Sequence, residues 1–444
     1  MYSEHNIVSQ IRDSENYYIV NLLSRNADIL EPELARRYLN ENLSPEELSA
    51  FREKGYITDK ESETALYKKR YLDFIEARDE SEVQLFFVPT YACNFACSYC
   101  YQETYAPKQQ PWSREVSDAF FGYIEREFAG RRKYITIFGG EPLLPSKSIR
   151  EGLEYFIRRS AELDIDIAVV TNGYNLLDYL DVLSMATIRE IQVTLDGPRD
   201  VHNKRRPLKN GEGTFDAIVK GVDAALQHGF PVNLRVVLDR ENVDALPELA
   251  RFAESRGWTA NENCKTQFGR NYELHVCQKE RDKIFSRIGL YEKIYSLLLE
   301  HPEIGEFHRP AYSVSRFLFD NGELPEPLFD SCPGCKTEWA FYYTGKIYAC
   351  TATVGKTGEE LGTFYPEAAL LEEAVEEWED RDVVSISSCE GCPVRLACGG
   401  GCAAVAKNSS GELHSPDCRP VKELLALGVS LYFEKELIPG RTNI

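Results

Sequence analysis

The sequence has fewer basic than acidic side chains and no long apolar run. Its 444 residues carry 51 lysines and arginines against 71 aspartates and glutamates, a formal net charge of −20. Such a charge repels phosphate backbones and anionic membrane surfaces, so neither is an expected partner. No window approaches the roughly 18 consecutive apolar residues of a membrane span, and the N-terminus lacks the pattern of a targeting signal. We therefore expect a cytoplasmic protein.

Low-complexity tracts and internal repeats are also absent. With 43% hydrophobic and 27% charged residues, the chain is expected to be globular, with two or three domains. Its 13 cysteines are not expected to form disulfides in a reducing compartment, so metal binding or catalysis is the favoured interpretation. Eleven of them fall into two groups, and only Cys264 and Cys277 stand apart. These two are most simply buried apolar residues, with hydrogen donation as the alternative.

Residues 1–80 are expected to form a small, mostly helical unit that resembles a winged helix. In "LSPEELSAFREKG", Ser44 is the expected N-cap, Glu47 completes a capping box and Gly55 ends the helix. The run Tyr17 to Val20 is the one early strand candidate.

Residues 81–278 change to strands that alternate with helices. Short β-branched and aromatic runs predict strands at 83–89, 134–140, 166–173, 190–197 and 231–239. Repeated strand-helix units predict a parallel α/β sheet, open or closed as a barrel, with its site at the carboxyl ends of the strands. Residues 279–330 are expected to be a helical connector. A cysteine-rich domain at 331–430 and a tail at 431–444 complete the chain.

The stretch "PTYACNFACSYCYQE" places Cys93, Cys97 and Cys100 just after the first of these strands and supplies no fourth cysteine nearby. A structural zinc site uses four protein ligands, so three cysteines leave a position open. In an iron-sulfur cube each thiolate binds one iron, so three thiolates leave one iron free for a substrate or a cofactor.

This CxxxCxxC motif, with Tyr99 before its last cysteine, resembles the signature of radical S-adenosylmethionine (SAM) enzymes. The resemblance implies a partial (β/α)6 TIM-like barrel with the motif on its first βα loop. It also implies a [4Fe-4S] cluster whose open iron chelates SAM. One electron, delivered by an external reductant such as flavodoxin or ferredoxin, then cleaves SAM to a 5′-deoxyadenosyl radical that abstracts a substrate hydrogen.

Three further segments resemble the same family and imply SAM contacts. They supply Gly139, Gly140, Glu141 and Pro142 of "GGEP", Thr171 and Asn172 of "TNG", and Thr194 and Arg206 of "TLDGPRDVHNKRRP". By the resemblance, the backbone and carboxylate of GGEP meet the amino group of SAM. The guanidinium of Arg206 can pair with the SAM carboxylate. Tyr99 is either a core aromatic or a wall for the adenine.

The second group of cysteines resembles a SPASM domain. From Cys335 the pattern reads C-x9-G-x4-C, a gap, C-x2-C-x5-C-x3-C, a gap, C. The resemblance implies two auxiliary [4Fe-4S] clusters, making three clusters in all. Their ligands would be Cys332, Cys335, Cys350 and Cys402 for the first, and Cys389, Cys392, Cys398 and Cys418 for the second. The spacing alone leaves a pair of zinc sites open.

Enzymes with such a C-terminal domain mostly modify ribosomally made peptides. The resemblance therefore favours a maturase that binds a precursor peptide, through the N-terminal unit as a leader-recognition module, and installs a thioether or carbon-carbon crosslink. A formylglycine maturase of the anaerobic sulfatase type is an alternative, although Thr351 stands where that branch has an aspartate. Peptide epimerisation, with Cys264 or Cys277 as hydrogen donor, and a non-catalytic iron-sulfur electron-transfer protein remain open.

Overall fold

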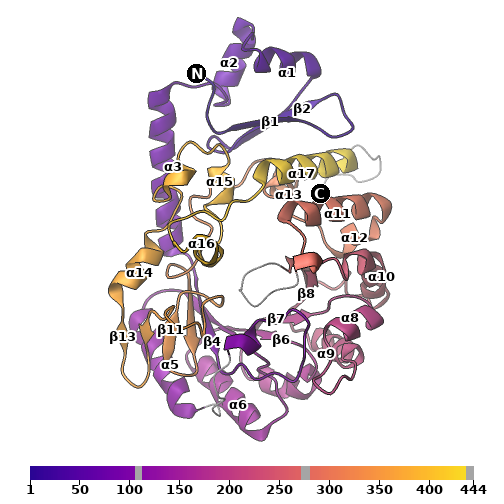
Figure 1. Ribbon diagram of the computed structural model, residues 1–444, viewed down its shortest axis with the longest axis vertical. Helices are drawn as coiled ribbons and strands as arrows, with labels where there is room; N and C mark the ends of the chain where they lie inside the picture. The colour runs from indigo at the N-terminus through magenta and orange to yellow at the C-terminus, as the bar shows by residue number, and fades with distance from the viewer. Residues whose placement is uncertain (106–112, 272–280, 437–444) are drawn as a thin grey trace.

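A ten-stranded sheet organises the molecule. The computed structural model describes residues 1–105, 113–271 and 281–436 (Figure 1). The order of the strands in this sheet is β13-β12-β11-β10-β4-β5-β6-β7-β8-β9. The six strands β4 to β9 are neighbours in chain order and all parallel, as repeated strand-helix units require. The predicted α/β fold with a partial barrel is confirmed.

Five of the barrel strands correspond to strands predicted from the sequence. They are β4 (Val83–Val88), β5 (Lys133–Ile137), β6 (Ile167–Thr171), β7 (Ile188–Thr194) and β8 (Val232–Leu238). The sixth, β9 (Cys264–Arg270), has a mostly polar sequence and none of its residues is fully buried. It lies at the edge of the sheet, where one neighbour and solvent replace the packing that gives inner strands an apolar signature.

Helices cover the outer face of these strands. The largest are α5 (Arg114–Glu127), α6 (Lys147–Glu162), α9 (Phe215–Gln227) and α10 (Leu246–Ser255). In α9 the buried Phe215, Ile218 and Val222 recur at helical spacing and belong to the main apolar core with the outward-facing strand residues. This core leaves the inner face of the sheet to polar side chains.

The cysteine-rich domain continues the barrel sheet. Its strand β10 (Glu338–Tyr342) pairs in parallel with β4, followed by β11 (Lys346–Tyr348), β12 (Gly362–Thr363) and β13 (Ala369–Leu370) in antiparallel order. The connector before it contains α11 (Arg287–Glu300), α12 (Glu303–Phe307) and α13 (Ser315–Asn321). The pairing of β10 with β4 fixes the second cysteine group against the first barrel strand.

The remaining helices outside the N-terminal unit are short, apart from one at the end of the described chain. They are α4 (Gln102–Tyr105), α7 (Leu180–Leu183), α8 (Arg199–Arg205), α14 (Glu372–Glu379), α15 (Arg395–Cys398), α16 (Ala403–Ser410) and the longer α17 (Val421–Glu436). In α14, an acidic helix, Val375 and Trp378 are buried. Among the described residues, no helix combines the length and apolar character needed to cross a membrane.

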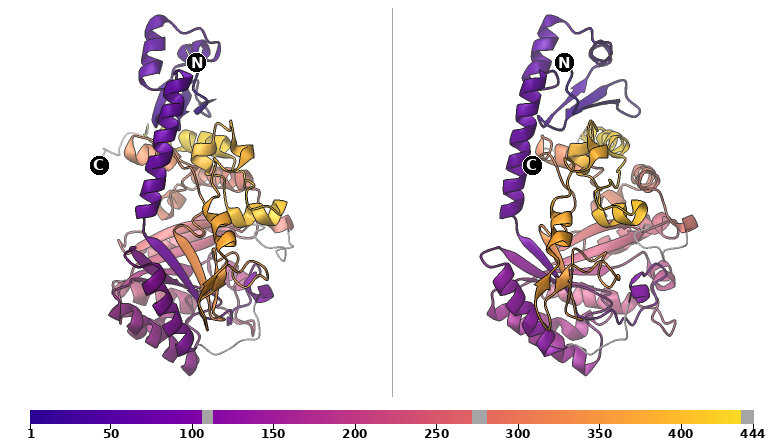
Figure 2. Two further views of the ribbon diagram at one scale, coloured as in Figure 1. Left: turned by 90° about the vertical axis from the view of Figure 1, so that its left-hand side faces the viewer. Right: turned by 60° about the vertical axis from the view of Figure 1, so that its left-hand side comes forward.

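The N-terminal unit has more strand than the sequence indicates. It combines a three-stranded antiparallel sheet, β1 (Asn6–Gln10), β2 (Tyr17–Asn21) and β3 (Asn26–Leu30), with α1 (Pro32–Leu39), α2 (Pro45–Glu53) and α3 (Lys60–Glu80). The predicted capping box of α2 is present, and the predicted strand is β2. Figure 2 shows α3 running along one side of the molecule from this unit to the barrel.

The N-terminal unit shares an apolar core with the C-terminal half. Ile7, Tyr18 and Leu22 pack in one cluster with Phe329 and Val429. Because this core holds side chains from both ends of the chain, removal of residues 1–80 would expose apolar surface on the cysteine-rich domain.

Candidate active site

The cysteine loop, residues 89–101, follows β4 at the carboxyl edge of the barrel and lines a cavity of about 320 Å³. The cavity brings together most of the residues that the sequence assigns to SAM. Its walls include Cys93, Cys97, Tyr99, Cys100, Gly139, Gly140, Thr171, Asn172, Thr194 and Arg206. Glu141 and Pro142 are not among the lining residues. The volume lies in the range of small-molecule sites.

The cysteine loop is held by the segment that follows α8. The backbone N–H of Ala96 donates to the carbonyl of Pro207 at 2.9 Å, and that of Ser98 to the carbonyl of Arg205 at 3.0 Å. The N–H of Lys209 donates back to Asn94 at 2.9 Å. Two segments more than a hundred positions apart in the sequence thus fix each other's backbone beside the three cysteines.

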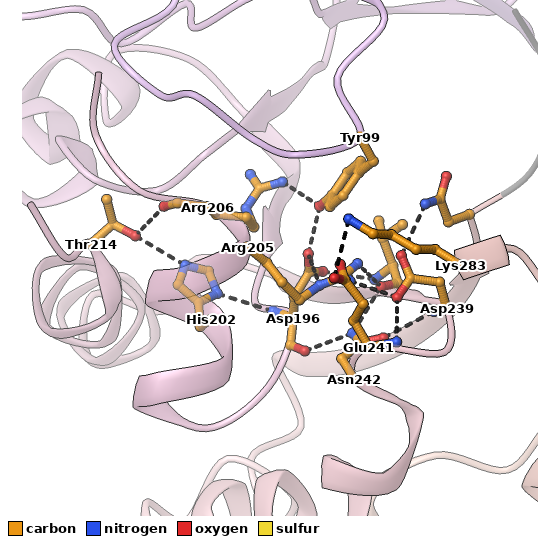
Figure 3. A network of polar contacts seen from close by, with 12 residues as sticks. Tyr99, Asp196, His202, Arg205, Arg206, Thr214, Asp239, Glu241, Asn242 and Lys283 are labelled. Atoms are coloured by element: carbon orange, nitrogen blue, oxygen red, sulfur yellow. Dashed lines mark hydrogen bonds and ion pairs between the residues drawn. The ribbon is translucent and has the colours of Figure 1, made fainter. Parts of the chain in front are cut away.

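A network of polar contacts around Tyr99 supports the loop from the barrel side (Figure 3). The Tyr99 hydroxyl donates to Asp196 Oδ2 at 2.6 Å and accepts from Arg206 Nη1 at 2.6 Å. The guanidinium of Arg205 lies 5.2 Å from the centre of the Tyr99 ring. Tyr99 is half-buried in this network and also lines the cavity, and its contact with an adenine stays a prediction.

Arg205, Asp196 and Asp239 form a buried ionic group that sequence reasoning missed. Arg205 Nη1 lies 2.6 Å from Asp239 Oδ1, and its Nε lies 3.4 Å from Asp196 Oδ2, with all three side chains almost fully buried. Beside them, burial lowers the pKa of His202 well below its usual value, and His202 Nδ1 accepts the N–H of Asp196. The "DG…H…R" spacing therefore encodes a support for the cysteine loop.

The two glycines of GGEP pack directly on the start of the cysteine loop. A β-carbon at Gly139 would lie 2.3 Å from the carbonyl oxygen of Thr90, and one at Gly140 would lie 2.1 Å from that of Ala92. Gly139 also has φ near +150°, within the region that favours glycine. Only glycine allows the two backbones to come this close.

Glu141 is buried beside the cavity instead of lining it, and its expected contact with SAM stays a prediction. Its carboxylate is 1% exposed and accepts three hydrogen bonds, from Leu143 N at 2.8 Å, Thr171 Oγ1 at 2.7 Å and Asn172 N at 2.6 Å. Burial raises the pKa of Glu141 to about 7. Because the carboxylate faces the end of β6 rather than the cavity, it ties the GGEP turn to the TNG segment.

The donor set of the cavity fits an iron-sulfur cluster with a small anionic ligand. Burial, with the mutual repulsion of the three thiolates, raises the pKa of Cys93 to about 12 and that of Cys97 to about 11. Metal binding would favour the thiolate form of these otherwise neutral thiols. Arg206 is 7% exposed and its buried Nε has no partner among the described residues, as a guanidinium awaiting a carboxylate would.

No three His, Cys, Asp or Glu side chains in the described ranges gather closely enough to hold one metal ion.

The eight C-terminal cysteines separate into two groups of four. Charges on Cys332 and Cys402 add to burial in raising the pKa of Cys350, and a charge on Cys332 does the same at Cys335. Cys389 instead interacts with Cys398, Cys392 and Cys418. The two interleaved ligand sets that the family resemblance implies divide the cysteines in the same way, and their binding of clusters stays a prediction.

A turn of three glycines explains why Cys398 and Cys402 fall into different groups. Gly399, Gly400 and Gly401 have φ values of 58°, 73° and 72°, a left-handed run that redirects the chain between the two cysteines. Arg381 holds this turn from within the core. Its guanidinium is 0% exposed and donates to the carbonyls of Gly400 at 2.9 Å, Gly401 at 3.2 Å, Leu413 at 2.8 Å and Ser415 at 2.9 Å.

Thr351 connects the first C-terminal group to the cavity. It follows Cys350 and lines the cavity beside the three loop cysteines. Its side chain offers a neutral hydroxyl where an aspartate would offer a carboxylate base. Its backbone N–H donates to Glu338, a β10 carboxyl whose pKa burial raises to about 7 and which sequence reasoning missed.

The two isolated cysteines do not add a donor to the cavity within the described residues. Cys264 opens β9, paired with the first residue of β8, at the edge of the sheet opposite the cysteine loop. Cys264 is partly rather than fully buried, and the alternative of hydrogen donation stays untested. Cys277 lies outside the described residues.

Comparison with known proteins assigns the central segment to a class. Residues 87–253 match the family model for the Radical SAM superfamily. The match spans the cysteine loop and the barrel up to α10, so this segment is similar to a radical SAM domain. Such a domain implies a [4Fe-4S] cluster and SAM.

Curated relatives match part of the chain. The probable GTP 3′,8-cyclase of Methanopyrus kandleri is 36% identical over 164 residues, which cover 36% of this chain and 49% of the relative. The GTP 3′,8-cyclase of Campylobacter jejuni subsp. doylei is 33% identical over 173 residues, or 38% and 51%. The chain thus spans about half the length of the curated relatives it matches.

Solved structures match more of the chain at lower identity. Native anSMEcpe with bound AdoMet and Cp18Cys peptide gives a TM-score of 0.57 at 16% identity, covering 80% of this chain and 96% of that one. Streptococcus suis SuiB bound to precursor peptide SuiA gives 0.52 at 14% identity, covering 95% and 99%. At these identities the likeness shows the fold alone.

Proposed function

We propose that this chain is a radical SAM peptide maturase with a SPASM domain, which installs a thioether or carbon-carbon crosslink in a ribosomally made precursor peptide. The observation that carries the proposal is the grouping of eight C-terminal cysteines into two sets of four, the first of them beside the cavity of the loop cysteines. Two auxiliary clusters would use these sets, and a flavodoxin or ferredoxin would supply the electron.

In this proposal, different residues of the chain have different roles. Cys93, Cys97 and Cys100 would hold a cluster, and Arg206 would pair with the carboxylate of SAM. When bound, these cofactors supply hydrogen-atom abstraction. The Asp196 and Arg205 network keeps the cysteine loop in place, and the GGEP turn closes the opposite side of the cavity.

The two C-terminal groups would extend from the cavity toward the N-terminal unit. Thr351 places the first group beside the barrel, whereas Cys389 of the second group lies in the apolar core shared with β1 and β2. A series of centres in this order suits removal of an electron from a substrate radical as it closes to a new bond. A substrate thiol bound at an opened auxiliary cluster is the other role that such a site supports.

A second candidate is chemistry on a nucleotide. Relatives named GTP 3′,8-cyclase match at 33–36% identity, which exceeds the identity to the peptide-bound structures. These matches cover little more than a third of the chain. If the cysteine-rich domain helps to select the substrate, they count little against the peptide proposal.

A substrate comparison distinguishes the two candidates. We expect the reconstituted, reduced chain to release 5′-deoxyadenosine from SAM. With peptides encoded next to its gene, the product should lose the mass of two hydrogen atoms per crosslink. Conversion of GTP without any change in the peptides would reject the maturase in favour of the nucleotide candidate. Intact clusters with no 5′-deoxyadenosine would instead support an electron-transfer protein.

The N-terminal sheet offers an edge for a leader peptide. β3 is one edge strand of the three-stranded sheet and presents Ile29, which is 44% exposed. At the other edge, the segment after β1 contacts α17, where the N–H of Arg12 donates to Ser430 Oγ at 2.9 Å. An extended peptide can add as a strand at such an edge, and a lysine opposes that pairing. We expect Ile29→Lys to weaken binding of the precursor by about tenfold or more, measured by isothermal titration.

A matched variant controls for the added charge. Leu72→Lys introduces the same side chain on α3, where Leu72 is 66% exposed and lies away from the β3 edge. We expect Leu72→Lys to bind the precursor normally, and both variants to cleave SAM at the wild-type rate. Unchanged affinity in Ile29→Lys would remove β3 as the docking edge. Point variants are preferred to deletion because of the shared core.

A further inference from the structure

The inner face of the barrel carries polar side chains next to the cavity. Side chains alternate along a strand, so Glu190, Gln192 and Thr194 of β7 and Asn233 and Arg235 of β8 point inward. Of these, Glu190, Gln192 and Arg235 line a second cavity of about 370 Å³, and Gln192, Thr194 and Arg235 line the first. The two cavities share Phe138, Val170, Gln192, Arg235 and Thr351. Arg235 therefore stands where they meet.

Arg235 differs from the other cations of this wall because it lacks a partner. Lys265 Nζ lies 2.6 Å from Glu190 Oε2, and Arg189 pairs with Glu82. Within the described residues, the side chain of Arg235 makes no ion pair and no hydrogen bond, although it is only partly exposed. A charge removed from water without a partner is unfavourable, so a counter-ion is expected from elsewhere.

The neighbouring strand leaves room for this guanidinium. Gly269 of β9 lies opposite it, and a β-carbon at that position would come within 3.1 Å of both Nε and Nη2 of Arg235. Gln192 on the other neighbouring strand supplies an amide whose side chain makes no hydrogen bond within the described part of the chain and can complete a polar pocket. The site thus combines one unpaired cation, a neutral donor and adjacent free volume.

We infer that Arg235 binds a carboxylate of the substrate and so positions an acidic residue of the peptide beside the reacting carbon. A guanidinium and a carboxylate form two parallel hydrogen bonds, which fix orientation as well as charge. One unpaired cation matches a monoanion, whereas a triphosphate calls for several. The inference rests on the proposed function because it takes the substrate to be a peptide.

Short peptides test the inference without knowledge of the precursor. The probes are Ac-Ala-Ala-Glu-Ala-Ala-NH2, its glutamine counterpart, and the free acid Ac-Ala-Ala-Gln-Ala-Ala-OH, titrated by saturation-transfer NMR into the reconstituted chain with SAM. We expect the glutamate peptide to bind about tenfold more tightly than the glutamine amide, as a charged hydrogen bond requires. Tight binding of the free acid alone would assign the carboxylate to a peptide C-terminus.

Variants identify the residue responsible. Arg235→Gln should abolish the preference, Arg235→Lys should keep part of it, and Lys265→Gln, an equal change of charge at a paired cation, should keep all of it. Equal binding of the glutamate and glutamine peptides by the wild type would overturn the inference. So would a preference that survives in Arg235→Gln, or Arg235-dependent binding of GTP without peptide preference.

The same measurements separate this inference from the proposed function. A crosslinked product together with no acidic preference would reject the Arg235 site and leave the maturase intact. An Arg235-dependent acidic preference with no modified peptide would keep the site and reject the crosslinking activity.

Discussion

Replacing Cys93, Cys97 and Cys100 together with alanine is expected to abolish release of 5′-deoxyadenosine from SAM. The three side chains line one cavity and would hold the cluster that binds SAM, so their joint loss should remove the site. Iron after anaerobic reconstitution should fall from about twelve to about eight atoms per chain, because each cube holds four irons. The measurements are iron and acid-labile sulfide content, with zinc determined alongside, and chromatography of 5′-deoxyadenosine.

Cys264→Ala is the matched control for this triple variant. Cys264 begins β9 at the opposite edge of the barrel, so its loss should change neither the iron content nor the cleavage of SAM. Undiminished cleavage in the triple variant would contradict the assignment of the cavity. About four irons with stoichiometric zinc in the wild type would keep the barrel site and reject both auxiliary clusters.

The elements that the sequence predicts are those with local signals. β4, β6 and β8 are rich in apolar and β-branched residues, and α2 has a capping box, so neighbouring residues suffice to identify them. β9 escapes because an edge strand with one packed side has a polar sequence. The pairing of β10 with β4 joins segments about 250 residues apart, and no local pattern encodes it.

The candidate site also contains residues with a local sequence signal and residues without one. The cysteine spacing indicates the ligands, and the cavity gathers them with Thr194 and Arg206. The supporting groups could not be identified in this way, because Asp239 acts only through Arg205 and the GGEP glycines are required by backbone contacts with Thr90 and Ala92. Glu141 illustrates the limit of a motif, since a carboxylate in the right segment faces its neighbours instead of the cavity.

Arg381→Met is expected to disrupt the cysteine-rich domain. The substitution keeps an unbranched apolar side chain but removes the donors to four carbonyls, two of them in the glycine turn between Cys398 and Cys402. Hydrogen bonds from a charged donor contribute about 1.5–3 kcal/mol each, and buried carbonyls left unpaired add a penalty. We therefore expect a loss of at least about 4 kcal/mol in the free energy of unfolding, measured by denaturant titration.

The same variant should reveal how the interleaved cysteine groups depend on that turn. Without it, Cys398 and Cys402 lose their separate directions, so iron should fall toward the roughly four atoms of the barrel cluster. Arg381→Lys retains the charge but not the four-way fork, and should lie between the wild type and Arg381→Met. Arg309→Met, at a half-exposed arginine paired with Asp320, should stay within about 0.5 kcal/mol of the wild type. A stable Arg381→Met chain with about twelve irons would show that the glycine turn holds its shape without this side chain.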